Sequence, residues 1–404
     1  MAGNTLITAD IIAPLALAHL ENNLVMPKLV TRAYEKDFKE VGDTIRIRKP
    51  VQFQVNDGPD ITTKIQDVNE STTTLVLNKY KDVAWKFSSK DLTLTVAEYT
   101  KRYIKPAAIA LANQVDIDGL EMYKYIANLV GDYAKPAGYA DIAEVAQLMD
   151  ENAVPDDGMR RMVLSPEGKY GMTAALAALN TADKEVVIPS LRRNFLGRIA
   201  NIDLFSDQNV WQHTSGAQTT VAIHATLTAA STLSEIAVNG LDANLVVGDS
   251  FSIAAVNNVN PISKKSTGTP KDFVVTTALT YTGTADTVAF SPTIVMSDDT
   301  TESTGPAYQN VDAYPLSAAV VTFADNSGTQ YTNDLAFHKD GIALAMAPLI
   351  LPDSAVFKSR AANNNISIRL IKGFDILLDY EVIRMDILYG WKVIYPELCV
   401  RRAS

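Results

Sequence analysis

The spacing of apolar side chains near the amino terminus is helical. Thr8 is a residue type that caps helices, and the segment behind it keeps a period of three to four residues. The positions at this spacing are Ile11, Ile12, Leu15 and His19. Pro27 then stands where a second short helix could begin. We predict an arm over residues 1–43 with two short helices, packed either on its own domain or on a neighbouring subunit.

From residue 44 the period changes to two, which is typical of half-buried strands. One such run begins at Thr44 and a second covers residues 72–87. The segment between them is polar and rich in turn-forming residues. We predict a long two-stranded hairpin over residues 44–90 with a charged tip. Because an isolated hairpin is marginal in water, it should lie against its own domain or another chain.

The strongest helical pattern covers residues 94–130, where apolar positions recur every three or four residues. Pro106 either opens this helix in its first turn or kinks it, because proline clashes with the preceding turn. An ordinary helix facing the core explains this stripe, and no cofactor is needed for it.

Residues 136–216 and 327–404 mix helical and strand-like patterns. Helices are predicted near residues 141–153 and 166–180. The strand-like runs include residues 162–164, 199–205, 366–371 and 382–395. By pattern alone, the two stretches predict one α+β domain.

Residues 217–326 differ sharply in composition from their flanks. They contain three basic and ten acidic side chains, and short β-favouring runs alternate with Gly, Asn, Pro and Asp. The runs are residues 245–247, 251–256, 273–277, 288–290 and 319–323. This spacing predicts a small antiparallel β-barrel or sandwich. We interpret it as a domain inserted into a surface loop of its host.

Composition narrows the classes of protein to which the chain can belong. A chain of 404 residues exceeds the roughly 250 to 300 at which single cores stop growing, so two or more packed units are expected. Cys399 is the only cysteine, which excludes an intrachain disulfide. No cationic leader region and no apolar run of bilayer length is present, so we expect a soluble cytoplasmic product without membrane contact. The net charge of −10 argues against sequence-specific nucleic-acid binding.

No local motif supports catalysis. Phosphate loops, nucleophile elbows, zinc-protease helices and calcium loops are absent from the sequence. The pair His338 and Asp340 is most simply a structural loop, and the acidic cluster of Asp298, Asp299 and Glu302 is more simply solvated than a cation site. We predict a protein that is not an enzyme and that needs no cofactor or metal.

Motifs in a fixed order carry a family resemblance outside residues 217–326. In the amino-terminal half they are LENNLV at 20–25, Arg32, Tyr34, GDTIRIRKP at 42–50, DLTL at 91–94, YIKPA at 103–107 and LAN at 111–113. Further on they are GRIA at 197–200, SDQNV at 206–210, HTSG at 213–216, HKDG at 338–341, RMDILYG at 384–390 and PE at 396–397. Together they resemble the major capsid (coat) proteins of short-tailed bacteriophages that carry an inserted domain.

The resemblance implies an α+β Hong Kong 97-type capsid fold. Its parts would be an amino-terminal arm (1–43), an extended hairpin loop (44–90) and a peripheral domain with a long spine helix (91–135). Residues 136–216 and 327–404 would form the axial domain plus strands returning to the peripheral domain, and 217–326 an inserted β domain. The implied product is an icosahedral head of self-assembled hexamers and pentamers enclosing phage DNA.

The resemblance also implies partners and contacts. Expected partners are other copies of the chain, a scaffolding protein, a portal protein at one vertex and double-stranded DNA bound non-specifically. The virion capsid is the expected location, after assembly in the host bacterial cytoplasm. The expected inter-subunit residues are Lys264, Lys265 and Lys271 in a loop over residues 257–272, and Arg46, Arg48, Asp57, Asp60 and Lys64 in the extended loop. Asp10 and Glu21 are candidates for contact with scaffolding protein.

Two functions from other classes remain open at this point. One is a phage tail or surface-adhesion protein whose β domain binds a ligand. The other is a hydrolase whose site assembles only in space. Small fixed oligomers would favour the first and substrate turnover the second, whereas closed shells of many copies would favour a capsid protein.

Overall fold

A computed structural model of the chain describes residues 9–36, 44–53, 55, 58–59, 62, 65, 70–88, 103–131, 138–178, 197–228, 233–283, 285–297, 305–324, 328, 330–353, 355, 357–363, 366–375 and 380–403. The chain divides into two compact units. The first comprises Met1–Ile47, Thr74–Gly119 and Ile342–Lys392. The second comprises Arg48–Thr73, Leu120–Gly341 and Val393–Ser404.

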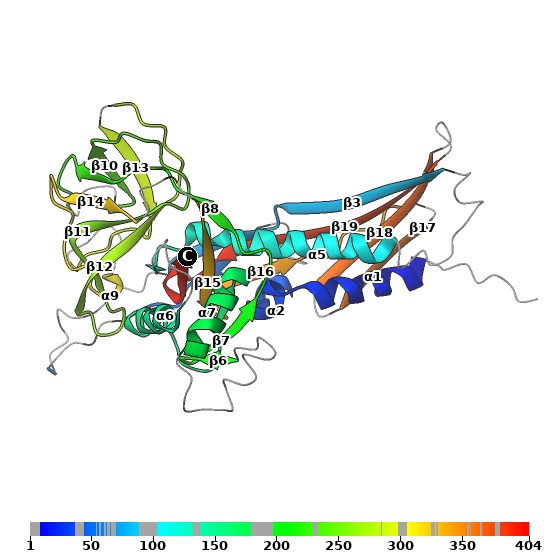
Figure 1. Cartoon of the computed structure of the whole chain (residues 1–404), viewed down its shortest axis with the longest axis horizontal. Coiled ribbons are helices and arrows are strands. Elements are labelled where there is room, and N and C mark those ends of the chain that lie inside the picture. Colours follow the sequence, from blue (N-terminus) through cyan, green and yellow to red (C-terminus); the bar gives the residue numbers. More distant parts are fainter. Residues whose placement is uncertain are drawn as a thin grey trace, which may run out of the picture. The chain divides into compact units, whose positions relative to one another are not determined.

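A five-stranded antiparallel sheet organises the first unit. Its order is β16-β19-β18-β17, with β3 also paired to β19. The strands are β3 (Lys79–Ser88), β16 (Ile342–Met346), β17 (Phe357–Asn363), β18 (Ile366–Asp375) and β19 (Tyr380–Val393). Two helices, α1 (Ala9–Asn23) and α5 (Lys105–Leu120), run alongside these strands in Figure 1.

The amino-terminal arm packs on its own unit. Helix α1 lies on β17 and β18 and buries Ala16, Leu17 and Leu20. The second predicted helix is α2 (Met26–Leu29), and the Val25 and Met26 N–H groups both donate to the Asp116 carboxylate at 3.0 Å. Asp116 therefore satisfies free donors at the start of α2. The arm covers its own sheet in this chain, and its contact with a neighbouring subunit stays a prediction. A 3₁₀ turn, η1 (Ala33–Lys36), follows α2.

The predicted two-stranded hairpin is only partly present. Strands β1 (Thr44–Arg48) and β2 (Thr72–Val76) pair as a small sheet, but the chain then turns and β3 pairs with β19 over ten residues. A continuous second strand was therefore the wrong prediction. The second half of the run pairs instead with β19, far along the chain, and the Val76 carbonyl lies in the space that a Cβ of Gly390 would take.

The long helix ends earlier than predicted. Helix α5 begins at Lys105 with Pro106 in its first turn, where proline costs no intrahelical hydrogen bond. It ends at Leu120 and is followed by the 3₁₀ turn η3 (Glu121–Tyr125), so the prediction of helix to residue 130 is wrong. The predicted beginning at residues 94–102 lies outside the described residues.

A seven-stranded mixed sheet organises the second unit. Its order is β4-β20-β15-β5-β7-β6, with β8 also paired to β15. The strands are β4 (Leu129–Val130), β5 (Arg160–Leu164), β6 (Arg198–Ile199), β7 (Ile202–Ser206), β8 (Gln212–Thr214), β15 (Gln330–His338) and β20 (Cys399–Ala403), and a 3₁₀ turn η4 (Pro396–Leu398) precedes the last.

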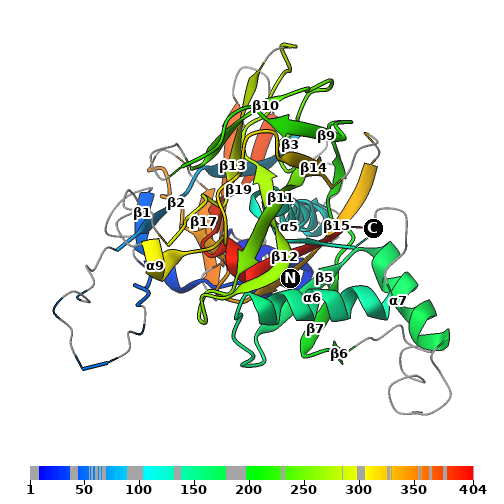
Figure 2. The same cartoon turned by 90° about the vertical axis from the view of Figure 1, so that its left-hand side faces the viewer.

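Two helices cover this sheet as the sequence predicts. They are α6 (Tyr139–Glu151) and α7 (Pro166–Ala178), both visible in Figure 2. Ile142 and Met149 of α6 join Met162 and Val400 of the sheet in one buried cluster. The carboxy-terminal segment, however, does not stay with this sheet. Strands β16 to β19 belong to the first unit, so the expectation of a single α+β domain from pattern alone is wrong.

Residues 217–326 contain a closed six-stranded antiparallel barrel, one of the two predicted alternatives. Its order is β10-β13-β12-β11-β14-β9, closing back onto β10. The strands are β9 (Thr220–Ile223), β10 (Glu235–Asn239), β11 (Ser250–Val259), β12 (Ser266–Val275), β13 (Asp286–Ser291) and β14 (Val320–Phe323). A short helix, α9 (Gly305–Tyr308), lies between β13 and β14. Strands β9 and β10 were not predicted.

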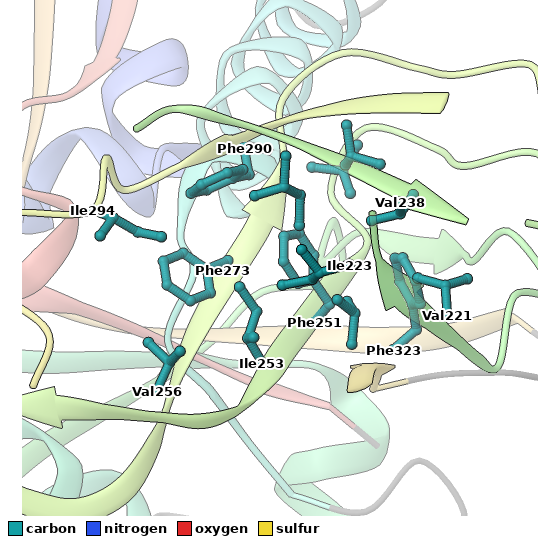
Figure 3. Close-up of a cluster of buried hydrophobic side chains, with 14 of the residues drawn as sticks. Val221, Ile223, Val238, Phe251, Ile253, Val256, Phe273, Phe290, Ile294 and Phe323 are labelled. Atoms are coloured by element: carbon teal, nitrogen blue, oxygen red, sulfur yellow. The ribbon is translucent and has the colours of Figure 1, made fainter. Parts of the chain in front are cut away.

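The barrel has its own aromatic core (Figure 3). The Phe251 ring lies 5.7 Å from that of Phe273, 5.9 Å from that of Phe290 and 5.5 Å from that of Phe323, measured between centroids. Aliphatic side chains such as Ile253 fill the remaining space. This core is separate from the cluster under α6, so the barrel carries its own hydrophobic stabilisation.

The two ends of the barrel lie side by side, as an insertion requires. On the host side β8 pairs with β15, with Thr214 opposite Gln330. On the barrel side β9 pairs with β14, with Thr220 opposite Thr322. The chain thus leaves and re-enters its host through neighbouring strands.

Candidate assembly surfaces

The predicted loop over residues 257–272 is mostly a β-hairpin. Strand β11 runs to Val259 and β12 begins at Ser266, which leaves residues 260–265 as the turn. Asn260 organises this turn, since its Oδ1 accepts the N–H groups of Ile262 and Ser263 at 2.9 Å each. The turn at residues 260–265 is therefore ordered by hydrogen bonds of its own.

The three candidate lysines have different environments. Lys265 is exposed at the turn, whereas Lys264 is partly buried, which lowers the pKa of its amine. Lys271 lies within β12 with 8% of its surface exposed, and its Nζ donates to Asn258 Oδ1 at 2.8 Å. Its inclusion in an exposed loop was wrong, and burial lowers the pKa of its amine too. Only Lys264 and Lys265 remain available at the tip.

The hairpin is tied to the end of α6. Asn258 Nδ2 donates to Asn152 Oδ1 at 3.0 Å. Asn260 Nδ2 donates to the Glu151 carbonyl at 2.8 Å and so satisfies a helix-terminal acceptor. The turn is thus held by its own subunit at its base.

A buried chain of hydrogen bonds joins the barrel to its host. The Tyr123 hydroxyl lies 2.9 Å from His213 Nδ1, and His213 Nε2 lies 2.9 Å from Asp249 Oδ1. Asp249 also accepts the Val246 N–H at 2.7 Å. Burial raises the pKa of Tyr123 above its usual value. With Tyr123 0%, His213 2% and Asp249 4% exposed, this Tyr-His-Asp chain has no access for a substrate and is a structural joint.

Further contacts support the joint. Arg401 Nη1 donates to the Gly248 carbonyl at 2.6 Å. The Asp272 carboxylate accepts the Leu129 N–H at 3.1 Å. Burial raises the pKa of Asp272 to about 6, although the positive charges of Lys271 and Arg401 act to lower it. No local signal in the sequence connects these residues, because their separations along the chain exceed one hundred positions.

The extended segment exposes both charged and apolar side chains. Arg46 and Arg48 are on the exposed face of β1, opposite the buried Ile45 and Ile47. Arg48 Nη1 lies 3.2 Å from Glu70 Oε2 in an exposed ion pair.

Apolar side chains are also exposed on this segment. Phe53 is 63%, Val55 92% and Ile65 77% exposed, which is typical of surfaces that become covered on association. Of the other candidate contacts, Asp57, Asp60 and Lys64 lie outside the described residues. Asp10 and Glu21 belong to α1, but their side chains are outside the described set.

The candidate chemical groups form no catalytic arrangement in the described part of the chain. His338 Nε2 lies 3.1 Å from Asp157 Oδ1, and burial leaves the imidazole 4% exposed. A metal-binding group of His, Cys, Asp and Glu side chains is absent from the described residues. Asp298, Asp299 and Glu302 lie outside them. Among the described helices, none has the length and apolar character to span a bilayer.

The chain is an α+β host with an inserted barrel. Its exposed charged turn and the exposed apolar side chains of its extended segment are typical of a structural subunit that associates with other copies. The chain belongs to the P22 coat protein (gene protein 5) family, whose model matches residues 1–401. It is therefore a bacteriophage major capsid protein of the Hong Kong 97-type fold, and copies of it assemble into the shell of the head. Its family is one of structural proteins and not of enzymes.

Solved structures similar to the chain include other phage capsids. Mycobacterium phage Che8 matches with 13% identity and a TM-score of 0.49, over 94% of this chain and 90% of that one. The capsid of cyanophage P-SCSP1u matches with 10% identity and a TM-score of 0.46, over 89% and 83%. The CUS-3 coat protein I-domain matches with 28% identity and a TM-score of 0.21, over 27% of this chain and 96% of that one. No curated protein matches the sequence significantly.

Proposed function

We propose that the chain assembles in the host cytoplasm, with a scaffolding protein, into hexamers and pentamers that close around a portal at one vertex. The finished shell encloses double-stranded DNA without reading its sequence. Membership of the coat protein family carries this proposal. The net charge of −10 supports a weak, non-specific contact with DNA, since a sequence reader needs a basic face.

The hairpin turn at residues 260–265 is proposed as a contact between neighbouring capsomers. Lys264 and Lys265 are cations on an insert with seven more acidic than basic side chains, so a partner copy offers them opposite charge. A contact across a two-fold axis uses the same patch on both copies, and complementary charge fixes its register. Ile262, 79% exposed at the same turn, adds apolar area.

The extended segment is proposed as a second contact between subunits. Arg46 and Arg48 supply exposed charge there, and Asp57, Asp60 and Lys64 are the further candidates at its tip. Asp10 and Glu21 of the arm are proposed to meet a basic scaffolding protein. Exposure and charge support Arg46 and Arg48, whereas the other assignments rest on charge and family membership.

A matched pair of variants tests the turn. The double substitution Lys264→Gln and Lys265→Gln removes two positive charges at the turn. Thr277→Glu with Thr280→Glu gives the same net change at two exposed barrel positions away from it. Shells formed with scaffolding protein are counted by negative-stain microscopy and challenged with heat. The lysine variant should give fewer or less stable shells than the threonine variant, and equal behaviour of the two would remove this role for the turn.

A further inference from the structure

A pocket of about 220 Å³ lies within the second unit, beside the base of the hairpin turn. Its wall includes Asn152 at the end of α6, Lys264 and Lys271 from the hairpin, Tyr308 of α9, and Glu397 of η4. The joint at His213 does not use this space, and the proposed contact at the tip shares Lys264 with it.

A chain of hydrogen bonds, in which the donor and acceptor of each bond are fixed, determines which polar group faces the pocket without a partner. The Lys271 ammonium group can only donate, so Asn258 must turn its Oδ1 toward Lys271. The Asn258 amide nitrogen then donates to Asn152 Oδ1, which fixes the second amide as well. Asn152 Nδ2 is left as the end of the chain.

Asn152 Nδ2 is buried and has no hydrogen-bond partner among the described residues, in a residue 4% exposed. A buried donor without a partner destabilises the fold, and such groups are rare in folded proteins. Since Asn152 lines the pocket, a ligand with an acceptor atom can satisfy this group. The unpartnered donor is the observation that points to an occupant.

Charge in the pocket favours an anion. Lys264 and Lys271 both line it, while the acidic residue among the lining, Glu397, is exposed and can be solvated. The Tyr308 hydroxyl accepts the Gln52 N–H at 3.1 Å and keeps its own proton to donate. Amine, amide and phenol donors therefore surround one space, as in sites for oxyanions.

We propose that this pocket binds a small free oxyanion of the phosphate class, held by Asn152 Nδ2 and the amines of Lys264 and Lys271. The ligand joins the hairpin turn to the end of α6 and so stiffens the part of the insert that faces other copies. Its site shares Lys264 with the proposed tip contact, whose other cation, Lys265, is exposed and does not line the pocket.

Inorganic phosphate is the probe for this site. The full-length chain is titrated by calorimetry against phosphate in a chloride buffer of matched ionic strength. Three variants are compared: Asn152→Asp, Lys264→Gln and Lys265→Gln. Asn152→Asp keeps the acceptor for Asn258 but replaces the free donor with a negative oxygen. Lys265→Gln removes the same charge as Lys264→Gln from the next residue, which does not line the pocket.

Saturable binding by the wild-type chain is expected, about tenfold or more weaker in Asn152→Asp and about threefold to tenfold weaker in Lys264→Gln, with Lys265→Gln unchanged. Circular dichroism and sedimentation check that each variant keeps the wild-type fold and assembly state. Absence of saturable binding overturns the proposal, as does equal weakening in the two lysine variants. If Asn152→Asp fails to fold, the comparison of the two lysine variants decides.

Discussion

At the residue scale, Asp272 links burial to the pH dependence of folding. Burial raises its pKa from 3.8 to about 6, although the Leu129 N–H, Lys271 and Arg401 all favour the charged form. Between about pH 4 and pH 6 the folded chain therefore holds a proton that the unfolded chain releases. The contribution of Asp272 to the free energy of unfolding falls as pH rises through this window and is level above it.

Substitution of Asp272 by Asn should remove this pH dependence. Asparagine keeps an oxygen for the Leu129 N–H and does not titrate. Relative to wild type, the variant should gain stability as pH rises from 4 to 7, by up to about 3 kcal/mol for a shift of two pKa units. Urea unfolding of both chains across this range measures the difference. A constant difference between the two would show that Asp272 does not titrate in this window.

Gly119 occupies a helix position where a side chain does not fit. A Cβ at this residue would lie 2.7 Å from Cζ2 of Trp391, closer than side chains normally pack. Gly119→Ala should therefore cost about 1 to 3 kcal/mol by overpacking, in spite of the better helix propensity of alanine.

A double-mutant cycle with Trp391→Phe tests the cause, because phenylalanine lacks the outer ring. The second substitution should recover part of the loss, and the coupling is measured from thermal unfolding. An increase in stability for Gly119→Ala alone would contradict the packing explanation.

At the element scale, the barrel contains what a domain needs to fold alone. Its six strands close on themselves, and Phe251 contacts three other phenylalanines in a core that the host does not share. Residues 217–326 expressed alone should give a β-rich spectrum and one cooperative thermal transition. Phe251→Ala should destabilise this fragment by about 3 to 5 kcal/mol through the cavity it leaves. The exposed Tyr281→Ala serves as the control, and an unfolded wild-type fragment would show that the barrel needs its host.

Local signals in the sequence correctly predicted elements whose own residues determine them, such as helices α6 and α7. Helix α7 begins at Pro166 and α6 carries an unbroken helical stripe, and both formed where predicted. The period-two run at residues 72–87 is the same whether it makes one strand or two, and its second half pairs with the distant strand β19. Pattern cannot show such a partner.

The hairpin lysines show a second limit of local signals. Gly268 and Pro270 are residue types that favour loops, yet both lie within β12, whose pairing with β11 shifts register. Irregular strands tolerate glycine and proline. A prediction from turn-forming residues alone therefore placed Lys271 in an exposed loop, where it does not lie. Its partners, Asn258 and Asn152, belong to different elements and become neighbours only in the fold.

At the scale of the whole molecule, the insert has its own core but is held to its host by the buried joint. The joint consists of polar side chains that hydrogen-bond one another: Tyr123 and His213 from the host and Asp249 from the barrel. Such a network favours one arrangement strongly, since any displacement leaves buried polar groups without partners. An assembling subunit benefits, because contacts made through the barrel then act on the body of the subunit.

Substitution of His213 by Leu should remove the hydrogen bonds of this joint while conserving most of the side-chain volume. The Tyr123 hydroxyl would lose its partner and Asp249 would keep only backbone donors, at a cost of about 1 to 3 kcal/mol. His224→Leu is the matched control, because His224 is exposed on the barrel and its imidazole bonds to the Asn239 side chain at the surface. Thermal unfolding and shell yield of the two full-length variants are compared. His213→Leu should lower both, His224→Leu neither, and equal effects would show that the chain of Tyr123, His213 and Asp249 does not couple the barrel to the capsid subunit.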